Sequence, residues 1–205
     1  IKILSLPRIT NFTDFAPLGE YPDMDITYVT GGKAIGEADM VIIPGAENPQ
    51  ESMEFIRKCG WDQEINVLLQ KETVILGIGT GFFLLGNTIT NSGNKVDTEQ
   101  IEGLGLLDFN AEIDEEKIPV RVSGKVIDNL PGPVYVLRKT EVEGYQIYSG
   151  KTTTNSKIKE FIEVEKYFDD DVTILEGLVS STGQVLGTSI HGIFECTYFC
   201  SRFIN

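Results

Sequence analysis

Residues 73–86 read TVILGIGTGFFLLG, and this stretch decides the fold. Its residues 74–76 form a short apolar run with two β-branched members, which predicts a buried strand. Three glycines at alternate positions then predict a sharp turn, because each one adds backbone entropy that a helix or strand interior would have to lose. The apolar residues 82–85 predict the start of a buried helix, with Gly86 as its C-cap.

A strand, a tight glycine turn and a helix together form the geometry of a nucleophile elbow, in which the residue at the apex points into a cleft. The amides that follow, at the helix N-terminus, can stabilise an oxyanion. The apex residue here is Gly79, which has no side chain. The window is therefore open to two interpretations. It is either the frame of a nucleophilic site without its nucleophile or an ordinary turn that makes room for helix-on-sheet packing.

The N-terminal half of the chain alternates strand-like and helix-like segments. Strands are predicted over residues 1–6, 25–29, 39–43 and 74–76, and helices over 48–59 and 62–71. A short helix after residue 10 has Asn11, Thr13 and Asp14 as possible N-caps. This alternation predicts an α/β fold with a parallel sheet and helices on both faces. Because ligand sites form beyond the carboxyl ends of such strands, the loops 7–15, 44–48 and 77–81 are predicted to converge on one crevice.

The C-terminal half has a different pattern of predicted elements. The sequence predicts a long loop over 87–100, strands over 120–126 and 143–150, a loop or hairpin over 151–159, a hairpin of 175–180 with 185–190, and a short helix ending at Phe203. No repeat or second core is found, so residues 1–205 are predicted to be one domain. Because the chain begins directly in a strand and without Met, we expect a fragment of a longer protein.

Composition excludes several classes of function. The chain has 31 acidic and 17 basic residues and a net charge of −14, so it is not expected to bind nucleic acid. Three cysteines without a CxxC pair predict neither a disulfide framework nor a metal site, and they fit a reducing cytoplasm. No signal peptide and no apolar run of membrane-spanning length is found, so no membrane association is expected.

His191 is the only histidine, and it directly follows a predicted strand at a glycine. A lone histidine is more often a surface or core residue than a catalyst. Its place at a strand end, like that of the glycine turn, makes it a candidate base, because a nucleophile–histidine pair needs proximity in space and not in sequence.

Several motifs, in order along the whole chain, resemble one family. Residues 6–15 (LPRITNFTDF) are similar to its LPRxSNFTDF signature, and further matches are 42–48 (IIPGAEN), 101–107 (IEGLGLL), 144–150 (GYQIYSG) and 187–195 (GTSIHGIFE). The chain is identified as similar to the C-terminal glutamine amidotransferase domain of cobyric acid synthase, in the triad-type class I superfamily. The resemblance implies a flavodoxin-like, doubly wound sheet with an antiparallel extension in the C-terminal half.

The resemblance also implies a function. In the family, this domain hydrolyses glutamine and delivers ammonia to an ATP-dependent half, which amidates corrinoid carboxylates in cobalamin biosynthesis. No Walker-type GxxxxGK[ST] occurs here, so that half is expected to be a partner outside this chain. ATP and Mg²⁺ are expected only there, and no cofactor is expected in this domain. Gly45, Ala46, Thr80, Phe83, Tyr145 and Gln146 are predicted to form the oxyanion and substrate pocket, with glutamine or a small anion as its ligand.

The chain departs from the family at the residues that carry out the catalytic chemistry. The family elbow reads GICGGYQ, whereas residues 77–83 read GIGTGFF. Gly79 stands at the cysteine nucleophile position and Phe83 at a glutamine position, while Gln146 and Tyr148 replace an acid and a histidine. Without a thiolate there is no covalent glutamyl intermediate, so His191 would be a base with nothing to activate.

Two functional hypotheses follow from these departures. The first is a cobyric acid synthase-type amidotransferase domain that has lost glutamine hydrolysis. The second is a non-enzymatic binding or scaffolding module that reuses the crevice, with Thr80 and the helix amides holding a small anion. A flavin or nucleotide binder is disfavoured, because no phosphate-cradling loop with a following Lys or Arg is present.

Overall fold

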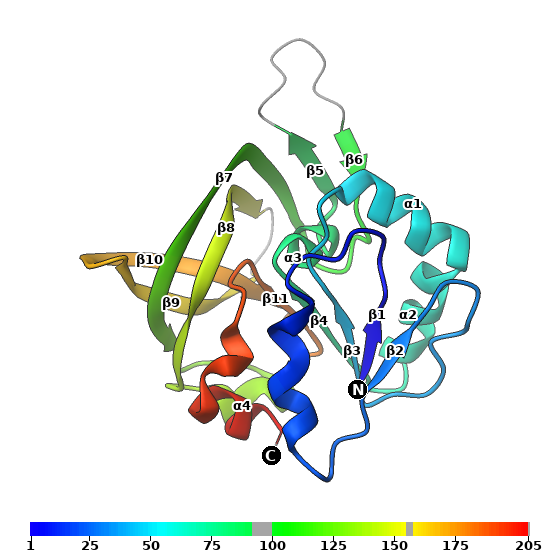
Figure 1. Cartoon of the computed structure of the whole chain (residues 1–205), viewed down its shortest axis with the longest axis horizontal. Helices are drawn as coiled ribbons and strands as arrows, with labels where there is room; N and C mark the ends of the chain where they lie inside the picture. The colour runs from blue at the N-terminus through cyan, green and yellow to red at the C-terminus, as the bar shows by residue number, and fades with distance from the viewer. Residues whose placement is uncertain (92–99, 155–157, 205) are drawn as a thin grey trace.

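A computed structural model describes residues 1–91, 100–154 and 158–204 of the chain. Most of the residues predicted as a loop over 87–100, and the tip of the one predicted over 151–159, lie outside this part. The described strands form one mixed sheet in the order β2-β1-β3-β4-β11-β10-β9-β7-β5-β6, with β8 paired to the free side of β7 (Figure 1). The α/β class and the mixture of parallel and antiparallel pairing are as predicted.

The parallel half of the sheet is built from short apolar strands. They are β1 (Lys2–Leu4), β2 (Thr27–Val29), β3 (Met40–Ile43), β4 (Val74–Ile78) and β11 (Val185–Thr188). All four neighbouring pairs among them run parallel, and β4 lies between β3 and β11. Every residue of β4 is buried, as expected for a strand covered on both faces.

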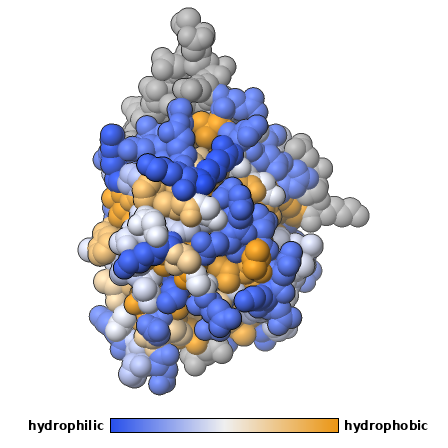
Figure 2. Space-filling view, turned by 90° about the vertical axis from the view of Figure 1, so that its right-hand side faces the viewer, coloured by the Kyte–Doolittle hydropathy of each residue, from blue (hydrophilic) through white to orange (hydrophobic). Residues whose placement is uncertain are grey.

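One face of this parallel half is covered by α1 (Pro49–Cys59), α2 (Trp61–Leu69) and α3 (Thr80–Leu84). The start of α1 follows local rules: Asn48 is the N-cap, its side chain accepts from the Glu51 amide at 3.0 Å, and Pro49 takes the first position. Gly60, at φ 73°, ends the helix. The side of the molecule that carries α1 and α2 is mostly hydrophilic, with small separate apolar areas (Figure 2).

The other face is covered by the 3₁₀ segments η1 (Phe12–Glu20), η2 (Gly132–Leu137) and η3 (Ile193–Glu195) and by α4 (Thr197–Phe203). Alternate residues of the strands supply the two cores, so Val41 packs on the α1–α2 side and Ile42 on the η1–α4 side. Within the described part of the chain, no helix is long and apolar enough to cross a bilayer.

The remaining strands form an extension that is antiparallel except for one parallel pair, β5 with β7. They are β5 (Thr88–Asn91), β6 (Gln100–Glu102), β7 (Phe109–Val126), β8 (Glu141–Thr154), β9 (Lys159–Tyr167) and β10 (Asp170–Val179). The predicted hairpin about residues 181–183 is confirmed as β10–β11. The prediction of a loop or hairpin over 151–159 is wrong at its start, because residues 151–154 continue β8 and pair with β7. Threonines at 152–154, which favour extended backbone, account for this extension. The loop predicted over 87–100 is wrong at Thr88–Asn91, which form β5.

The glycine turn has the predicted strand–turn–helix form, with two corrections. Gly77 lies inside β4 and Gly81 inside α3; only Gly79, at φ 59° and ψ −128°, makes the turn itself. A Cβ on Gly77 would lie 2.7 Å from the Phe82 Cα, so the strand and helix backbones are in direct contact. Gly86 is not a C-cap: Leu85 ends α3 in a right-handed conformation, and Gly86 is required because Phe109 packs against its Cα.

Candidate functional site

The three loops predicted to converge do so at the carboxyl ends of β1, β3 and β4. Ile9 forms an isolated antiparallel bridge with Ala46, and the Thr10 amide donates to the Gly45 carbonyl at 2.8 Å. The Gly79 amide donates to the Thr188 carbonyl at 2.9 Å, which ties the turn to the end of β11. Because all strands of this half are parallel, their ends meet at one edge, and His191 comes to that edge three residues after β11.

The imidazole of His191 lies against the bare Cα of Gly79. A Cβ built on Gly79 would lie within 3.0 Å of both Nε2 and Cε1 of His191, a separation that real Cβ atoms essentially never show. The ring also packs close to Gly45, where a Cβ would lie 2.8 Å from Cε1. The structure therefore brings Gly79, Gly45 and His191 together, and the ring occupies the space that a side chain at position 79 would need.

Asp14 holds the imidazole from the other side. Its Oδ2 lies 2.7 Å from His191 Nδ1, and both side chains are almost fully buried, at 3% and 1% exposure. Nδ1 therefore faces the carboxylate, while Nε2 is buried without a hydrogen-bond partner in the part of the chain that the structure describes. Asn11 Nδ2 lies 3.1 Å from the same Nδ1. Asn11 occupies the N-cap position of η1, as predicted, but its side chain makes no cap hydrogen bond. The prediction of Thr13 and Asp14 as N-caps is wrong, because both lie inside η1 and Asp14 faces His191.

Tyr145 covers one face of the imidazole. The two rings stack with centroids 5.7 Å apart and an interplanar angle of 23°, and the two backbones exchange hydrogen bonds at 2.8 and 3.0 Å. Burial, and then the negative charge of Asp14, raise the pKa of Tyr145 above its usual value, so this ring stays a neutral phenol. Tyr145 thus lies in the predicted crevice as a wall and an anchor of His191.

Thr80 closes the crevice between the turn and the loop after β3. Its Oγ1 accepts from the Ala46 amide at 2.7 Å and donates to the Ala46 carbonyl at 2.8 Å. Thr80 is 2% exposed and Ala46 is 1% exposed. Both main-chain groups of Ala46 are therefore already paired, and neither Thr80 nor Ala46 offers its polar groups to a ligand in this state.

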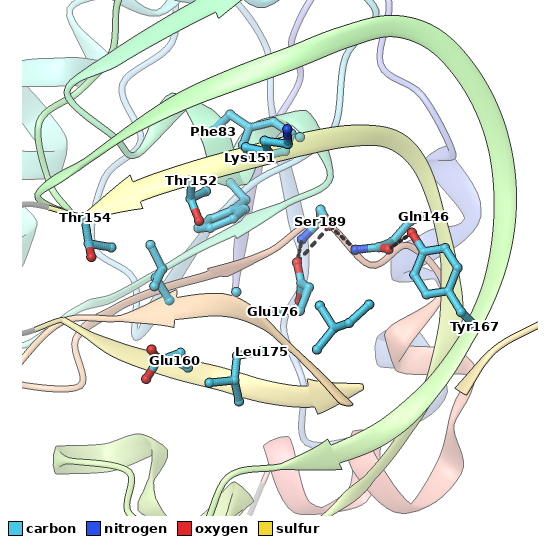
Figure 3. Close-up of a pocket in the computed structure, with 15 residues that line it drawn as sticks. Phe83, Gln146, Lys151, Thr152, Thr154, Glu160, Tyr167, Leu175, Glu176 and Ser189 are labelled. Carbon is cyan, nitrogen blue, oxygen red and sulfur yellow. Dashed lines mark hydrogen bonds between the residues drawn. The ribbon is translucent and has the colours of Figure 1, made fainter. Parts of the chain in front are cut away.

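Phe83 and Gln146 lie in a different place from the crevice around His191. They line a cavity of about 470 Å³ between β8 and β10, and neither Gly79, Thr80 nor His191 lines it. Gln146 Nε2 donates to Ser189 Oγ, and Gln146 Oε1 accepts from Tyr167, both at 2.6 Å (Figure 3). Since successive side chains of a strand point to opposite faces, Tyr145 faces the imidazole and Gln146 faces this cavity. Tyr148 lies outside the described side chains.

A buried acid anchors the polar wall of the cavity. Glu176 accepts from Thr188 Oγ1 at 2.6 Å and from both the amide and the hydroxyl of Ser189, at 2.6 and 2.8 Å. Burial raises the pKa of Glu176, and these donors act in the opposite direction. The result is a continuous chain of hydrogen bonds, Tyr167–Gln146–Ser189–Glu176, drawn as dashed lines in Figure 3.

Sequence reasoning missed two parts of this site. Asp14 was visible only as a possible helix cap, because its partner lies 177 positions away. Asp14 could have been suspected, because it stands within the LPRITNFTDF motif. Glu176 and Tyr167 carried no local signal in the sequence. In the described part of the chain, no three His, Cys, Asp or Glu side chains are grouped so that they could hold a metal ion.

A comparison with protein families explains why this elbow, loop and histidine occur together. The profile of the CobB/CobQ-like glutamine amidotransferase domain matches residues 1–199. The chain belongs to this amidotransferase family. The match spans all three converging loops and reaches beyond His191.

Curated relatives of this amidotransferase domain carry the name cobyric acid synthase. A protein of a Thermoanaerobacter species is 37% identical over 206 aligned residues, and one of Caldanaerobacter subterraneus is 39% identical. Each alignment covers 100% of this chain and 41% of the relative. The chain therefore spans less than half the length of the relatives it matches.

Solved structures agree on the fold of this amidotransferase domain. "Structure of PurLQS from Thermotoga maritima" covers 100% of the chain with a TM-score of 0.66 and 16% identity. A structure described as a glutamine amidotransferase covers 99% with a TM-score of 0.67 and 14% identity. At these identities the likeness concerns the fold alone, and it confirms the predicted class I amidotransferase architecture.

Proposed function

We propose that this chain is the amidotransferase domain of a cobyric acid synthase-type enzyme and that it no longer hydrolyses glutamine. The observation that carries this proposal is Gly79 at the apex of the elbow, with the His191 ring against it. Glutamine hydrolysis in this superfamily needs a thiolate that attacks the amide carbon, and a glycine offers no atom for that attack. The family position of the cysteine comes from the resemblance of the motifs, and the positive φ of Gly79 at the turn between strand and helix supports it.

The rest of the site fits a loss of function better than a replacement nucleophile. A water attacking in place of the thiol would need His191 Nε2 as its base, yet this atom is buried. The Ala46 amide, one of the predicted oxyanion donors, already donates to Thr80. Phe83, at a position where the family has glutamine, is buried and offers no polar group.

The retained role would be structural. The relatives are more than twice as long as this chain, so we propose an ATP-dependent synthetase half as the partner, with ATP and Mg²⁺ bound there and ammonia taken from solution. The reaction of the whole assembly would be the amidation of corrinoid carboxylates in the cytoplasm. Residues 1–205 would act in it as one domain that positions or covers the synthetase half.

The test is release of glutamate from glutamine by the purified domain, measured beside a cysteine-bearing relative. We expect no release above the uncatalysed background, a deficit of about 10⁴-fold or more, because the covalent step is missing. Turnover within tenfold of the relative would contradict the proposal. Measuring ammonia and glutamate together separates true hydrolysis from contamination by free ammonia.

A second candidate function is a non-enzymatic binding module that reuses the amidotransferase frame. The observation that favours it is the cavity beside β8, which persists although the crevice at Gly79 is filled. Binding of a small molecule to the isolated domain, without binding of a synthetase half, would support this second function over the first.

A further inference from the structure

The cavity between β8 and β10 lies apart from the crevice at Gly79. Strands β8 and β10 are not paired with each other, so the curled sheet leaves an opening between their edges (Figure 3). The cavity volume of about 470 Å³ falls within the range of small-molecule pockets. Neither Gly79, Thr80 nor His191 lines it, so a ligand bound there leaves the elbow undisturbed.

The wall of this cavity contains a buried carboxyl group that only donors surround. Glu176 lines the cavity and is 9% exposed, and its oxygens accept from Thr188 Oγ1 and from the amide and hydroxyl of Ser189. The other neighbour of each hydroxyl is also a donor: the Ile190 amide donates to Thr188 Oγ1, and Gln146 donates to Ser189 Oγ. Both hydroxyl protons therefore point to Glu176, an arrangement that suits the ionised carboxylate.

This carboxylate has no counter-ion. No Lys or Arg side chain in the described ranges forms an ion pair with Glu176. A buried charge without a partner is costly, and burial accordingly raises the pKa of Glu176. A cation in the adjoining cavity would supply the missing partner.

A second carboxylate, Glu160, lies on the same face of the sheet. Glu176 pairs with Ile162 across β9 and β10, and Glu160 stands two residues before Ile162. Because alternate residues of a strand share a face, Glu160 and Glu176 are diagonal neighbours, roughly 7–8 Å apart at their Cα atoms. Glu160 lines the cavity, is exposed, and makes no ion pair or side-chain hydrogen bond with the residues that the structure describes. Figure 3 shows it across the cavity from Thr152.

The basic residue that borders the cavity points elsewhere. Gln146, Gly150 and Thr152 line the cavity from alternate positions of β8. Strand alternation therefore turns the Lys151 side chain to the opposite face of β8, where Glu112 of β7 is its register partner. Among the described side chains, the charges on the cavity face are thus negative, and a ligand that complements them carries positive charge.

Much of the remaining lining is apolar. Phe82 and Phe83 are almost fully buried at the inner end, whereas Ile174 and Leu175 stand at the mouth with 46% and 53% of their surfaces exposed. Covering such aliphatic surface with a ligand removes it from water and is favourable. The ligand therefore needs a hydrocarbon body as well as a cation.

We propose that this cavity binds a small organic cation, a primary amine on a hydrocarbon body, of the class of isoamylamine or phenethylamine. Its ammonium group lies between Glu160 and Glu176, and its hydrocarbon body packs against Phe83 and Leu175. Binding goes beyond the proposed loss of glutaminase activity and does not depend on it, because no residue of the elbow takes part. Since Glu160 is exposed and the ligand is small, we expect a weak complex, with a Kd on the order of 1 mM.

The test is calorimetric titration of the whole chain with isoamylamine and phenethylamine, compared with three matched probes. Isoamyl alcohol lacks the cation, ethylamine lacks most of the hydrocarbon body, and leucine is isoamylamine with an added carboxylate. Salt at about 0.15 M screens general attraction of amines to the acidic surface. We expect saturable binding of at least one amine and at least about threefold weaker binding of every probe. Absence of saturable binding up to about 20-fold above the expected Kd, or binding of any probe within threefold of the amines, would overturn the proposal.

Variants with matched controls locate the binding. Glu160→Gln should weaken it about three- to tenfold, as expected for one exposed carboxylate, and Thr152→Trp should abolish it by filling the cavity. Glu163→Gln and Thr153→Trp make the same changes at neighbouring residues that do not line the cavity, and should leave the Kd unchanged. Equal effects of the cavity variants and these controls would refute the site.

Glu176→Gln tests the buried charge itself. It should weaken binding about tenfold or more, because it removes a desolvated partner of the cation. Urea denaturation establishes that this variant folds; if it does not, Glu160→Gln and Thr152→Trp decide the question alone. Unchanged binding by a folded Glu176→Gln would contradict the assignment. Glutamate release is measured separately, so failure here leaves the proposed function standing.

Discussion

Substituting the apex glycine tests whether the His191 ring truly fills the site. A Cβ at position 79 would lie within 3.0 Å of Nε2 and Cε1, whereas ordinary contacts lie at 3.4–4 Å. The ring would have to retreat by about 1 Å. It cannot do so freely, because Asp14 holds Nδ1 at 2.7 Å and Tyr145 stacks on one face. Gly79→Ala is therefore expected to be strongly destabilising.

The size of the effect can be divided into two contributions. A side chain at φ 59°, ψ −128° costs about 1–3 kcal/mol of backbone strain. Overpacking against a buried ring adds about 1–3 kcal/mol. Together, Gly79→Ala should lower the free energy of unfolding by roughly 2–6 kcal/mol. Gly36→Ala is the matched control, because Gly36 also has a left-handed φ of 74° but nothing lies within 4 Å of its Cβ position.

Urea denaturation of both variants measures the difference. With a slope of about 2 kcal/mol per molar urea, an excess loss of about 2 kcal/mol would lower the midpoint of Gly79→Ala by about 1 M relative to Gly36→Ala. A double-mutant cycle isolates the clash. In a His191→Ala background the contact is absent, so the cost of Gly79→Ala should fall by about 1–3 kcal/mol, to that of backbone strain.

Two results would refute this reasoning. Equal destabilisation by Gly79→Ala and Gly36→Ala would mean that the imidazole does not occupy the apex. A cost of Gly79→Ala that is unchanged by removal of His191 would mean that some other neighbour, or the backbone alone, opposes the side chain. Neither result would depend on any catalytic assay.

Further predictions concern the same crevice and its neighbours. Gly79→Cys alone should release no glutamate above background, because Thr80 still holds the Ala46 amide; release should become measurable only when Thr80→Gly and Phe83→Gln are added. Asp14→Asn should lower the free energy of unfolding by about 2–3 kcal/mol in thermal or urea denaturation, since it weakens a buried, charge-assisted hydrogen bond. The raised pKa of Glu176 means that the folded protein binds its proton more tightly than the unfolded chain, so stability should fall as pH rises above 4.5. This fall should be smaller in Glu176→Gln, measured by urea denaturation across pH.

The sequence was sufficient for what depends on local pattern. Apolar β-branched runs ended by Pro or Gly gave the parallel strands, and the rule for carboxyl ends of strands correctly brought Gly45, Gly79 and His191 to one edge. The hairpin about residues 181–183 followed from its turn chemistry. Each of these inferences uses information carried within about ten residues of chain.

Contacts between distant segments were beyond such reasoning. The Asp14–His191 pair joins positions 177 apart, and the chain of hydrogen bonds from Tyr167 to Glu176 joins three strands with the segment that follows β11. The prediction that Tyr145 and Gln146 share one pocket was wrong for a physical reason. Tyr145 and Gln146 are adjacent in sequence, but strand alternation sends them to opposite faces of β8. Without the register of β8, their shared motif suggested a shared cavity.

The closed crevice also explains why a glycine is stable at position 79, the proposed nucleophile position. Glycine adopts the left-handed turn without strain, the imidazole fills the space left beside it, and the Thr80 hydroxyl pairs both main-chain groups of Ala46. These three contacts stabilise the same closed arrangement but involve different atoms. Reversing any one of them leaves the other two in place, so restored hydrolysis requires several simultaneous substitutions. A single substitution that restored full activity would show that the crevice opens far more readily than its packing implies.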